Sequence, residues 1–305
     1  MIEIDLSGLK FQPTYTFDCG QVFRWRPTDA KKQEWVGVID NFVVRVRNAD
    51  VKIVSWEGPS SEIERNSIID YFSPEHNLDS ILGLIPCDEF LSASIREFPG
   101  LRLLTQDPWE CLISFVCSIN KNIPAIRLAI ENLCARFGNP IHSDLGKFYS
   151  FPTPDSLAHS KKPELLACKV GFRWKYIKYI AQKVSSGELD LDSLRLLDYE
   201  RARTMLVSEL SGHTFGVGPK VADCALLFSL QKTEAFPIDI WMIRCIKEHY
   251  ANSLGMDRSL LKSESLSTKS YAAVSKIMRT HFGEYAGYAQ QYLYMKTRSD
   301  SLHSR

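Results

Sequence analysis

The chain has 305 residues, of which 45% are hydrophobic and 24% charged, so it is long enough for two domains and can bury a substantial core. A formal net charge of +1 excludes a strongly basic protein, so any nucleic-acid binding has to come from a local surface. No apolar run reaches the roughly 18 residues that suggest a membrane helix, and the N-terminus lacks the pattern of a signal peptide. We therefore expect an intracellular protein, in the cytoplasm or nucleoid of a prokaryote or the nucleus of a eukaryote.

The first hundred residues are rich in strand-like segments. In EWVGVIDNFVVRVRN, two runs of β-branched residues flank Asp40 and Asn41, a pattern that is typical of a β-hairpin. The segment VKIVSWEG that follows predicts a third strand. We therefore expect an antiparallel, β-rich domain over residues 1–100.

Helical patterns take over beyond this point and continue to the end of the chain. In QDPWECLISFVCSIN, Asp107 is suited to cap a helix, Pro108 to its first position and Glu110 to complete a capping box. The helix that follows is apolar on nearly every face, so we expect it to lie at the centre of its domain. Asn122 is suited to cap the next helix, which should end at Gly138.

These patterns predict an α+β protein, with a mainly α-helical second domain over residues 101–298. We expect the boundary between the two domains within residues 95–105. The segment KTRSDSLHSR at the C-terminus is polar, so we expect a frayed tail over residues 299–305.

The segment FGVGPKVADC places Gly216 and Gly218 directly before an apolar helix. Glycines at a helix N-terminus leave backbone amides exposed, and such amides bind anions such as phosphate. A helix, a glycine hairpin and a second helix together form a clamp for the DNA backbone that does not read sequence. An ordinary turn explains the two glycines equally well.

Lys220 lies in the first turn of that apolar helix. The helix dipole and partial burial both disfavour its charged form, and a neutral amine is what a lysine nucleophile needs. The alternative is a surface lysine that reaches for phosphate. Asp239 follows among apolar residues in AFPIDIWM, where its carboxylate could stabilise a cationic sugar carbon, shuttle protons or cap the next helix.

The eight cysteines and seven histidines show no metal-binding spacing, and no C-x-x-C pair occurs. The cysteines lie mostly in apolar helical segments, where a free thiol behaves as a small hydrophobic group. We therefore expect neither a metal nor another cofactor.

Five segments together resemble the eukaryotic-type 8-oxoguanine DNA glycosylases, a branch of the helix-hairpin-helix DNA glycosylases. They follow the order of that family from about residue 17 to residue 294, and they are TFDCGQVFRW, GLRLLTQDPWECLISFVCSIN, FGVGPKVADC, FPIDI and YAGYAQQYLY. The resemblance implies a TATA-binding-protein-like N-terminal domain and a monomer that acts on duplex DNA containing 8-oxoguanine. It also implies base flipping, attack of Lys220 on the sugar C1′, a Schiff base and β-elimination, with Asp239 stabilising the cationic transition state.

The resemblance assigns further residues to a base pocket. It implies that the Gly20 carbonyl reads the N7 hydrogen of 8-oxoguanine, and that Cys224 lines the pocket beside the lysine. Gln290 would bind the base edge, and Tyr294 would take the place of a phenylalanine that stacks on the base. Gly287 lies at helical spacing from both and would allow close approach. From the residues alone, each of these positions is also compatible with ordinary packing or a turn.

The resemblance also assigns residues to the DNA duplex. Asn120 would fill the space that the flipped base leaves, Phe172 would act as a wedge, and Arg173 would contact the orphaned cytosine. Lys121 replaces a family asparagine and is expected to add a phosphate contact. Without the resemblance, the segment around residues 172–173 is equally an ordinary solvated basic helix.

Two positions depart from the family pattern. Trp241 stands where the family has a histidine that helps to hold a phosphate and the pocket. Ala125 stands where a second arginine reads the cytosine, so we expect weaker discrimination for cytosine opposite the lesion.

Two other functions are compatible with parts of this pattern. One is a glycosylase for another damaged base on the same scaffold, which the N-terminal β-rich segment and the absence of iron–sulfur cysteines disfavour. The other is a damage-sensing protein that binds DNA without catalysis, which would need neither Lys220 nor Asp239.

Overall fold

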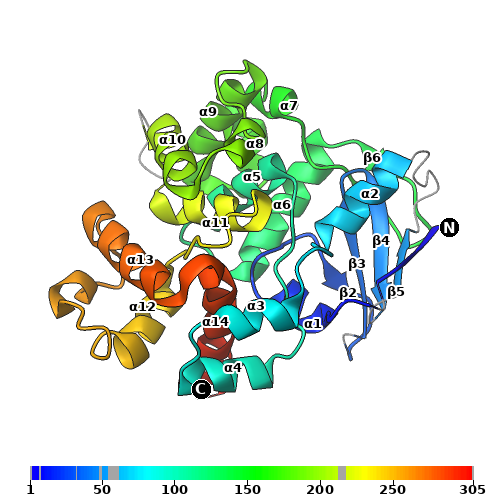
Figure 1. Ribbon diagram of the computed structural model, residues 1–305. Coiled ribbons are helices and arrows are strands. Elements are labelled where there is room, and N and C mark those ends of the chain that lie inside the picture. Colours follow the sequence, from blue (N-terminus) through cyan, green and yellow to red (C-terminus); the bar gives the residue numbers. More distant parts are fainter. Residues whose placement is uncertain are drawn as a thin grey trace.

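The computed structural model of the chain has the expected α+β architecture, with a small antiparallel sheet followed by a larger assembly of helices (Figure 1). It describes residues 2–6, 8–31, 33–47, 50–53, 62–211 and 218–303. Among these residues, none of the helices is both long and apolar enough to span a membrane.

The N-terminal sheet has five strands in the order β1-β5-β4-β3-β2, and all neighbours are antiparallel. Its strands are β1 (Ile2–Asp5), β2 (Arg26–Pro27), β3 (Glu34–Ile39), β4 (Phe42–Arg47) and β5 (Asp50–Ile53). The predicted hairpin is confirmed, and Asp40 at its turn has a φ of 51°. The predicted third strand is confirmed as far as Ile53, whereas the rest of VKIVSWEG lies outside the described residues.

Aromatic side chains form the core of this sheet. Trp25 and Trp35 are almost fully buried, and the Trp25 ring stacks on Phe17 with centroids 4.1 Å apart. Phe17 belongs to α1 (Pro13–Asp18). The Trp25 indole donates to the Tyr71 hydroxyl over 2.9 Å, which ties the sheet to α2 (Glu62–Tyr71).

The rest of the described chain is mainly helical, with one short two-stranded sheet formed by β6 (Pro140–Ile141) and β7 (Phe148–Tyr149). The remaining α-helices are α3 (Leu78–Leu84), α4 (Glu89–Glu97), α5 (Pro108–Ser118), α6 (Ile123–Phe137), α7 (Pro154–Ala158), α8 (Lys162–Ala167), α9 (Trp174–Ser185), α10 (Tyr199–Ser211), α11 (Pro219–Ser229), α12 (Ile240–Cys245), α13 (Thr268–Phe282) and α14 (Ala286–His303). Short 3-10 turns are η1 (Gly171–Arg173), η2 (Ser193–Leu196), η4 (Arg258–Leu261) and η5 (Gly283–Tyr285), and η3 (Ile246–Tyr250) is a π-helical turn.

Helix α5 is central, as predicted, and eight of its apolar residues are buried with Ser114. The Asp107 carboxylate caps it by accepting from the Glu110 amide over 2.7 Å. The prediction of a capping box is wrong, because the Glu110 carboxylate forms an ion pair with Arg24 at 2.7 Å instead. The Asn122 cap of α6 is confirmed, with its side chain accepting from the Ala125 amide over 3.0 Å.

The helical core recruits residues from before position 100. Leu78, Leu91 and Phe98, which lie on or next to α3 and α4, are buried in the same hydrophobic cluster as α5 and α11. The sheet has a separate cluster that includes Trp25, Trp35 and also Leu104, so the two clusters do not divide within residues 95–105. The predicted frayed tail is helical as far as His303, where α14 ends.

All eight cysteines are free thiols, and all but Cys87 are buried. Within the described ranges, no group of three or more His, Cys, Asp or Glu residues is arranged to hold a metal ion.

Candidate active site

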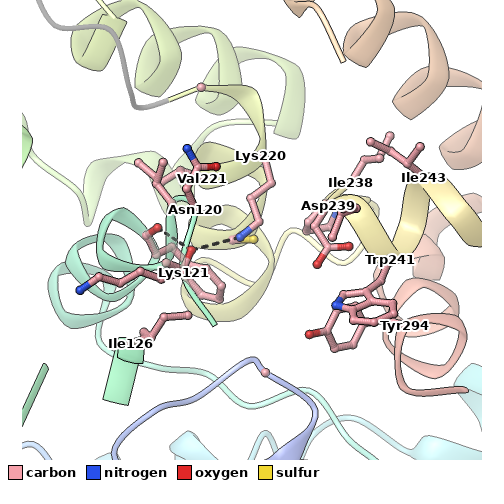
Figure 2. Close-up of a pocket in the computed structure, with 18 of the residues that line it drawn as sticks. Asn120, Lys121, Ile126, Lys220, Val221, Ile238, Asp239, Trp241, Ile243 and Tyr294 are labelled. Carbon is pink, nitrogen blue, oxygen red and sulfur yellow. Dashed lines mark hydrogen bonds between the residues drawn. The ribbon is translucent and has the colours of Figure 1, made fainter. Parts of the chain in front are cut away.

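A cavity of about 940 Å³ opens between α5, α11, α12 and α14 (Figure 2). It brings together most of the predicted site residues, although they come from distant parts of the sequence. Those that line it are Gly20, Asn120, Lys121, Gly218, Lys220, Cys224, Asp239, Trp241, Gln290 and Tyr294.

Lys220 is the second residue of α11, so its predicted place in the first helical turn is confirmed. Its amine donates to the Ser118 hydroxyl over 3.2 Å, and that hydroxyl donates to the Phe115 carbonyl over 2.7 Å. The Lys220 nitrogen also lies 4.9 Å from the centre of the Phe115 ring, within range of a cation–π contact. The end of α5 therefore fixes the position of the Lys220 amine.

Asp239 faces Lys220 across the cavity from a different helix (Figure 2). Its carboxylate caps α12 by accepting from the Met242 amide over 3.0 Å, which confirms the capping role. Burial raises the pKa of Asp239, while the positive charge of Lys220 and the helix amides act in the opposite direction. The carboxylate thus has a fixed orientation and a cationic partner nearby.

Cys224 lies one helical turn after Lys220 and is almost fully buried. Burial is the main reason why the pKa of its thiol rises to about 12, and Lys220 opposes this rise. At neutral pH the group is therefore a neutral thiol, which forms a polarizable, apolar part of the cavity wall.

Gly20 and Tyr294 meet at the opposite wall. Gly20 has a φ of +80°, a backbone conformation that favours glycine. A Cβ atom at this position would lie 3.1 Å from the Tyr294 hydroxyl. The glycine therefore allows the end of α1 and the tyrosine of α14 to approach closely.

Of the two other predicted residues of α14, Gln290 lines the cavity and Gly287 does not. Gln290 is buried at the cavity, and its side-chain amide donates to the Pro237 carbonyl over 3.1 Å. Gly287 lies outside the cavity lining, so its predicted place in the base pocket is not found. Its amide donates to the Thr233 carbonyl over 2.7 Å, and a Cβ there would lie 2.2 Å from Leu227 Cδ1. Gly287 is needed for close packing of α14.

Three residues predicted to contact the duplex form a second group, of which Asn120 also lines the cavity. Asn120 is exposed with a φ of 49°, and Phe172 is also exposed, at 49%. Arg173 is buried; it donates to the Val170 carbonyl over 3.1 Å, to the Asn120 carbonyl over 3.2 Å and to the Ile119 carbonyl. Arg173 thus holds the loop that carries Asn120.

The remaining predicted positions lie around the same opening. The Lys121 amine donates to the Lys169 carbonyl over 2.5 Å. Trp241 lines the cavity from the first turn of α12, with the Arg244 guanidinium 5.1 Å from its ring centre. Gly218 is the N-cap of α11, whereas Gly216 lies outside the described residues.

Sequence reasoning missed one buried group beside the site. Asp223 is fully buried between Lys220 and Cys224 on α11. It accepts from the Tyr199 hydroxyl and from Arg203 Nε, both over 2.8 Å, and from the Tyr271 hydroxyl over 2.7 Å. The single carboxylate in the apolar run VADCALLFSL was the available signal, because a buried charge needs partners.

Comparisons with known proteins agree with this architecture. Residues 3–112 match the model of the 8-oxoguanine DNA glycosylase N-terminal domain, and residues 113–265 match the HhH-GPD superfamily of base excision DNA repair proteins. The chain is 32% identical to a probable N-glycosylase/DNA lyase of Methanothermobacter thermautotrophicus, over 72% of this chain and 70% of that protein. It is 31% identical to the N-glycosylase/DNA lyase OGG1 of Arabidopsis thaliana, over 92% of this chain and 75% of that protein.

A solved structure gives the same result. It is the Clostridium acetobutylicum 8-oxoguanine glycosylase/lyase in complex with double-stranded DNA containing cytosine opposite 8-oxoguanine. The likeness has a TM-score of 0.80 and 32% identity, and it covers 95% of this chain and 93% of that chain. The chain therefore belongs to the 8-oxoguanine DNA glycosylase family, within the helix-hairpin-helix superfamily of base excision repair proteins.

Proposed function

We propose that this protein is a bifunctional DNA glycosylase and AP lyase that excises 8-oxoguanine from duplex DNA. The observation that carries the proposal is that Lys220 and Asp239 face each other in one cavity, in a chain of this family (Figure 2). The protein would act where the cell keeps its DNA, in the nucleoid or the nucleus.

The chemistry begins when the damaged nucleotide is flipped out of the duplex into the cavity. Once Lys220 has given up the proton of its charged form, its amine attacks the sugar C1′. The bond between C1′ and the base breaks as the new C–N bond forms, and the base leaves with the electron pair and takes up a proton. The Asp239 carboxylate stabilises the positive charge that develops at C1′ in the transition state. The bond that Asp239 accepts from the Met242 amide would hold this carboxylate in one orientation.

The lyase step follows from the covalent intermediate. Ring opening of the sugar converts the Lys220 adduct into a Schiff base. Loss of a proton from C2′ then allows the C3′–O bond to break, and the phosphate leaves with the electron pair. Hydrolysis of the remaining imine releases Lys220.

Base recognition would depend on Gly20. Its carbonyl is an acceptor, and 8-oxoguanine carries a hydrogen on N7 where guanine carries a lone pair. Guanine in the same position would leave two acceptors facing each other, and an unpaired buried polar group costs about 1–3 kcal/mol. Cys224 and Tyr294 would form the walls on either side of the base, and Gln290 would bind its edge.

Borohydride trapping on an 8-oxoguanine duplex tests this function. The parent protein should form a covalent adduct, and Lys220→Gln should form none because the amine is lost. Lys121→Gln is the matched control, since it removes a second lysine from the same cavity and should still give an adduct at saturating protein.

The outcomes separate the alternatives. Binding of the duplex without any adduct would identify a damage sensor. An adduct with another damaged base but none with 8-oxoguanine would identify a different glycosylase. An adduct that survives in Lys220→Gln would place the nucleophile elsewhere.

A further inference from the structure

One buried hydroxyl joins the two segments that carry Lys220 and Asp239. Tyr271 of α13 is buried, and its hydroxyl lies 2.7 Å from Asp223 Oδ2 and 3.1 Å from the Ile238 amide nitrogen. A backbone amide can only donate, so the tyrosine oxygen accepts from Ile238. The one hydroxyl proton of Tyr271 is therefore given to Asp223, and both bonds are fixed in direction.

Asp223 of α11, which accepts from the Tyr271 hydroxyl, is itself held in place. The other oxygen of Asp223, Oδ1, accepts from the Tyr199 hydroxyl and from Arg203 Nε, both over 2.8 Å and both from α10. Asp223 has no exposed surface, so rotation of its side chain would leave buried donors unpaired. The Tyr271 hydroxyl therefore bonds to a rigid point on the helix that carries Lys220.

Ile238, whose amide donates to the Tyr271 hydroxyl, directly precedes Asp239 in the sequence. Ile238 is buried, and its amide is the last one before the residue that caps α12. Fixing this amide limits how the backbone at Asp239 can shift relative to α11. Small shifts matter here, because a misplacement of about 1 Å in a reacting group can slow a reaction by about 100-fold.

We infer that Tyr271 is a positioning residue for catalysis, which holds the Ile238 amide at a fixed place relative to Asp223 and so sets the Asp239 carboxylate opposite Lys220. This inference rests on the proposed function. Tyr271 itself also lines the cavity, but its role here depends on the two bonds of its hydroxyl and not on contact with the base.

The simpler explanation is that Tyr271 only supports the core, and Tyr199 provides a matched control for it. Both are buried phenols that donate to the same carboxylate, and their bonds have lengths of 2.7 and 2.8 Å. Only the Tyr271 hydroxyl is bonded to the Ile238 amide. Each Phe variant therefore removes one bond to Asp223, and only Tyr271→Phe also frees the Ile238 amide. In Tyr199→Phe the Arg203 bond still holds Asp223, so the two variants should differ in their effect on Asp239.

The test compares the two variants by single-turnover excision of 8-oxoguanine, by DNA affinity and by amide hydrogen exchange. Tyr271→Phe should slow excision about tenfold, leave the Kd for the duplex within about twofold, and speed exchange of the Ile238 amide. Tyr199→Phe should keep the excision rate within about twofold and leave Ile238 exchange unchanged. All rates are taken at a temperature where both variants retain the near-UV circular dichroism of the parent.

A double-variant cycle shows whether the effect runs through Asp239. In an Asp239→Asn background, adding Tyr271→Phe should change the excision rate by less than about twofold. An undiminished tenfold loss in that background, or an equal loss in Tyr199→Phe, would reduce Tyr271 to core support. If the parent protein excises nothing, the proposed function fails, and Ile238 exchange still tests the hydrogen-bond link by itself.

Discussion

The cavity and the group of residues beside it differ in which atoms their hydrogen bonds hold. On the side that carries Lys220 and Asp239, which we call the chemical side, these two residues are held by groups at the end of α5 and in α12, the Ser118 hydroxyl and the Met242 amide. On the opposite-base side, which we define as residues 119–122 and 171–173, Arg173 holds the loop carbonyls of its own chain. Each of the three Arg173 side-chain nitrogens thus already donates within the protein.

The two parts of the site are therefore organised to different degrees before DNA binds. The chemical side is organised in advance, so little free energy is needed to bring its groups into position. On the opposite-base side, the expected contact between Arg173 and a cytosine would exchange one set of hydrogen bonds for another, and such an exchange would yield a small net gain. The chemical side should therefore be sensitive to single substitutions, and the opposite-base side should discriminate weakly.

The largest effect is expected on the chemical side. Asp239→Asn keeps a side chain that can cap α12 but removes the negative charge that faces Lys220. Single-turnover excision should fall about 100-fold, because charge stabilisation of the transition state is lost. The Kd for the lesion duplex should change much less. A loss of binding as large as the loss of rate would show that this side is not organised in advance.

A smaller gain is expected on the opposite-base side. Ala125→Arg restores an arginine on α6 where the family pattern has one, near the exposed Asn120. It should raise the preference for cytosine over the other three opposing bases by about tenfold, since one good arginine contact to a base contributes about 1–3 kcal/mol. Excision rates opposite all four bases measure this. A parent protein that already requires cytosine strictly would contradict the comparison.

The smallest expected effect is a change in the pKa of Asp239, which tests the electrostatic interaction between Lys220 and Asp239. Burial raises the pKa of Asp239 and Lys220 opposes that rise, so Lys220→Gln should move the pKa of Asp239 further up. As pH falls, the carboxylate should then take up its proton at a higher pH than in the parent. Carbon NMR of labelled aspartate measures this titration, with Lys121→Gln as the control. An unchanged midpoint in Lys220→Gln would mean that the two groups do not interact.

The same change in the pKa of Asp239 predicts how the free energy of unfolding should depend on pH. A carboxyl whose folded pKa lies above its unfolded pKa destabilises the fold once it is ionised, and this loss is relieved as pH falls through the folded pKa. Lys220→Gln should therefore be destabilised relative to the parent at neutral pH and less so at acid pH.

Local patterns predicted the chemical side well. The places of Lys220 and Asp239 at the starts of two helices follow from short motifs, because caps and first turns are set by neighbouring residues. Gly287 packs against Leu227 and does not line the cavity, because helical spacing fixes a shared face but not which end of the helix reaches the cavity. The link through Tyr271 was missed because it depends on how α13 packs against α11, which no local pattern encodes.

The length of the C-terminal helix, α14, was underestimated for a similar reason. Lys296 pairs with Asp300 at 2.8 Å on the same helix and with Glu97 of α4 at 2.9 Å. The sequence shows the first pair as a weak helical signal, but the second exists only once α4 and α14 have packed together. Polar composition alone therefore suggested a frayed end.

The buried thiols also determine how this protein reacts with oxidants. The thiolate is the nucleophile that reacts with peroxides, and burial raises the pKa of Cys19 to about 11 and that of Cys224 to about 12. Both groups at the cavity are thus protonated at neutral pH, and of the eight cysteines Cys87 alone is exposed. A protein whose substrate arises by oxidation of DNA therefore keeps the sulfur beside its catalytic amine in a form that resists the same oxidants.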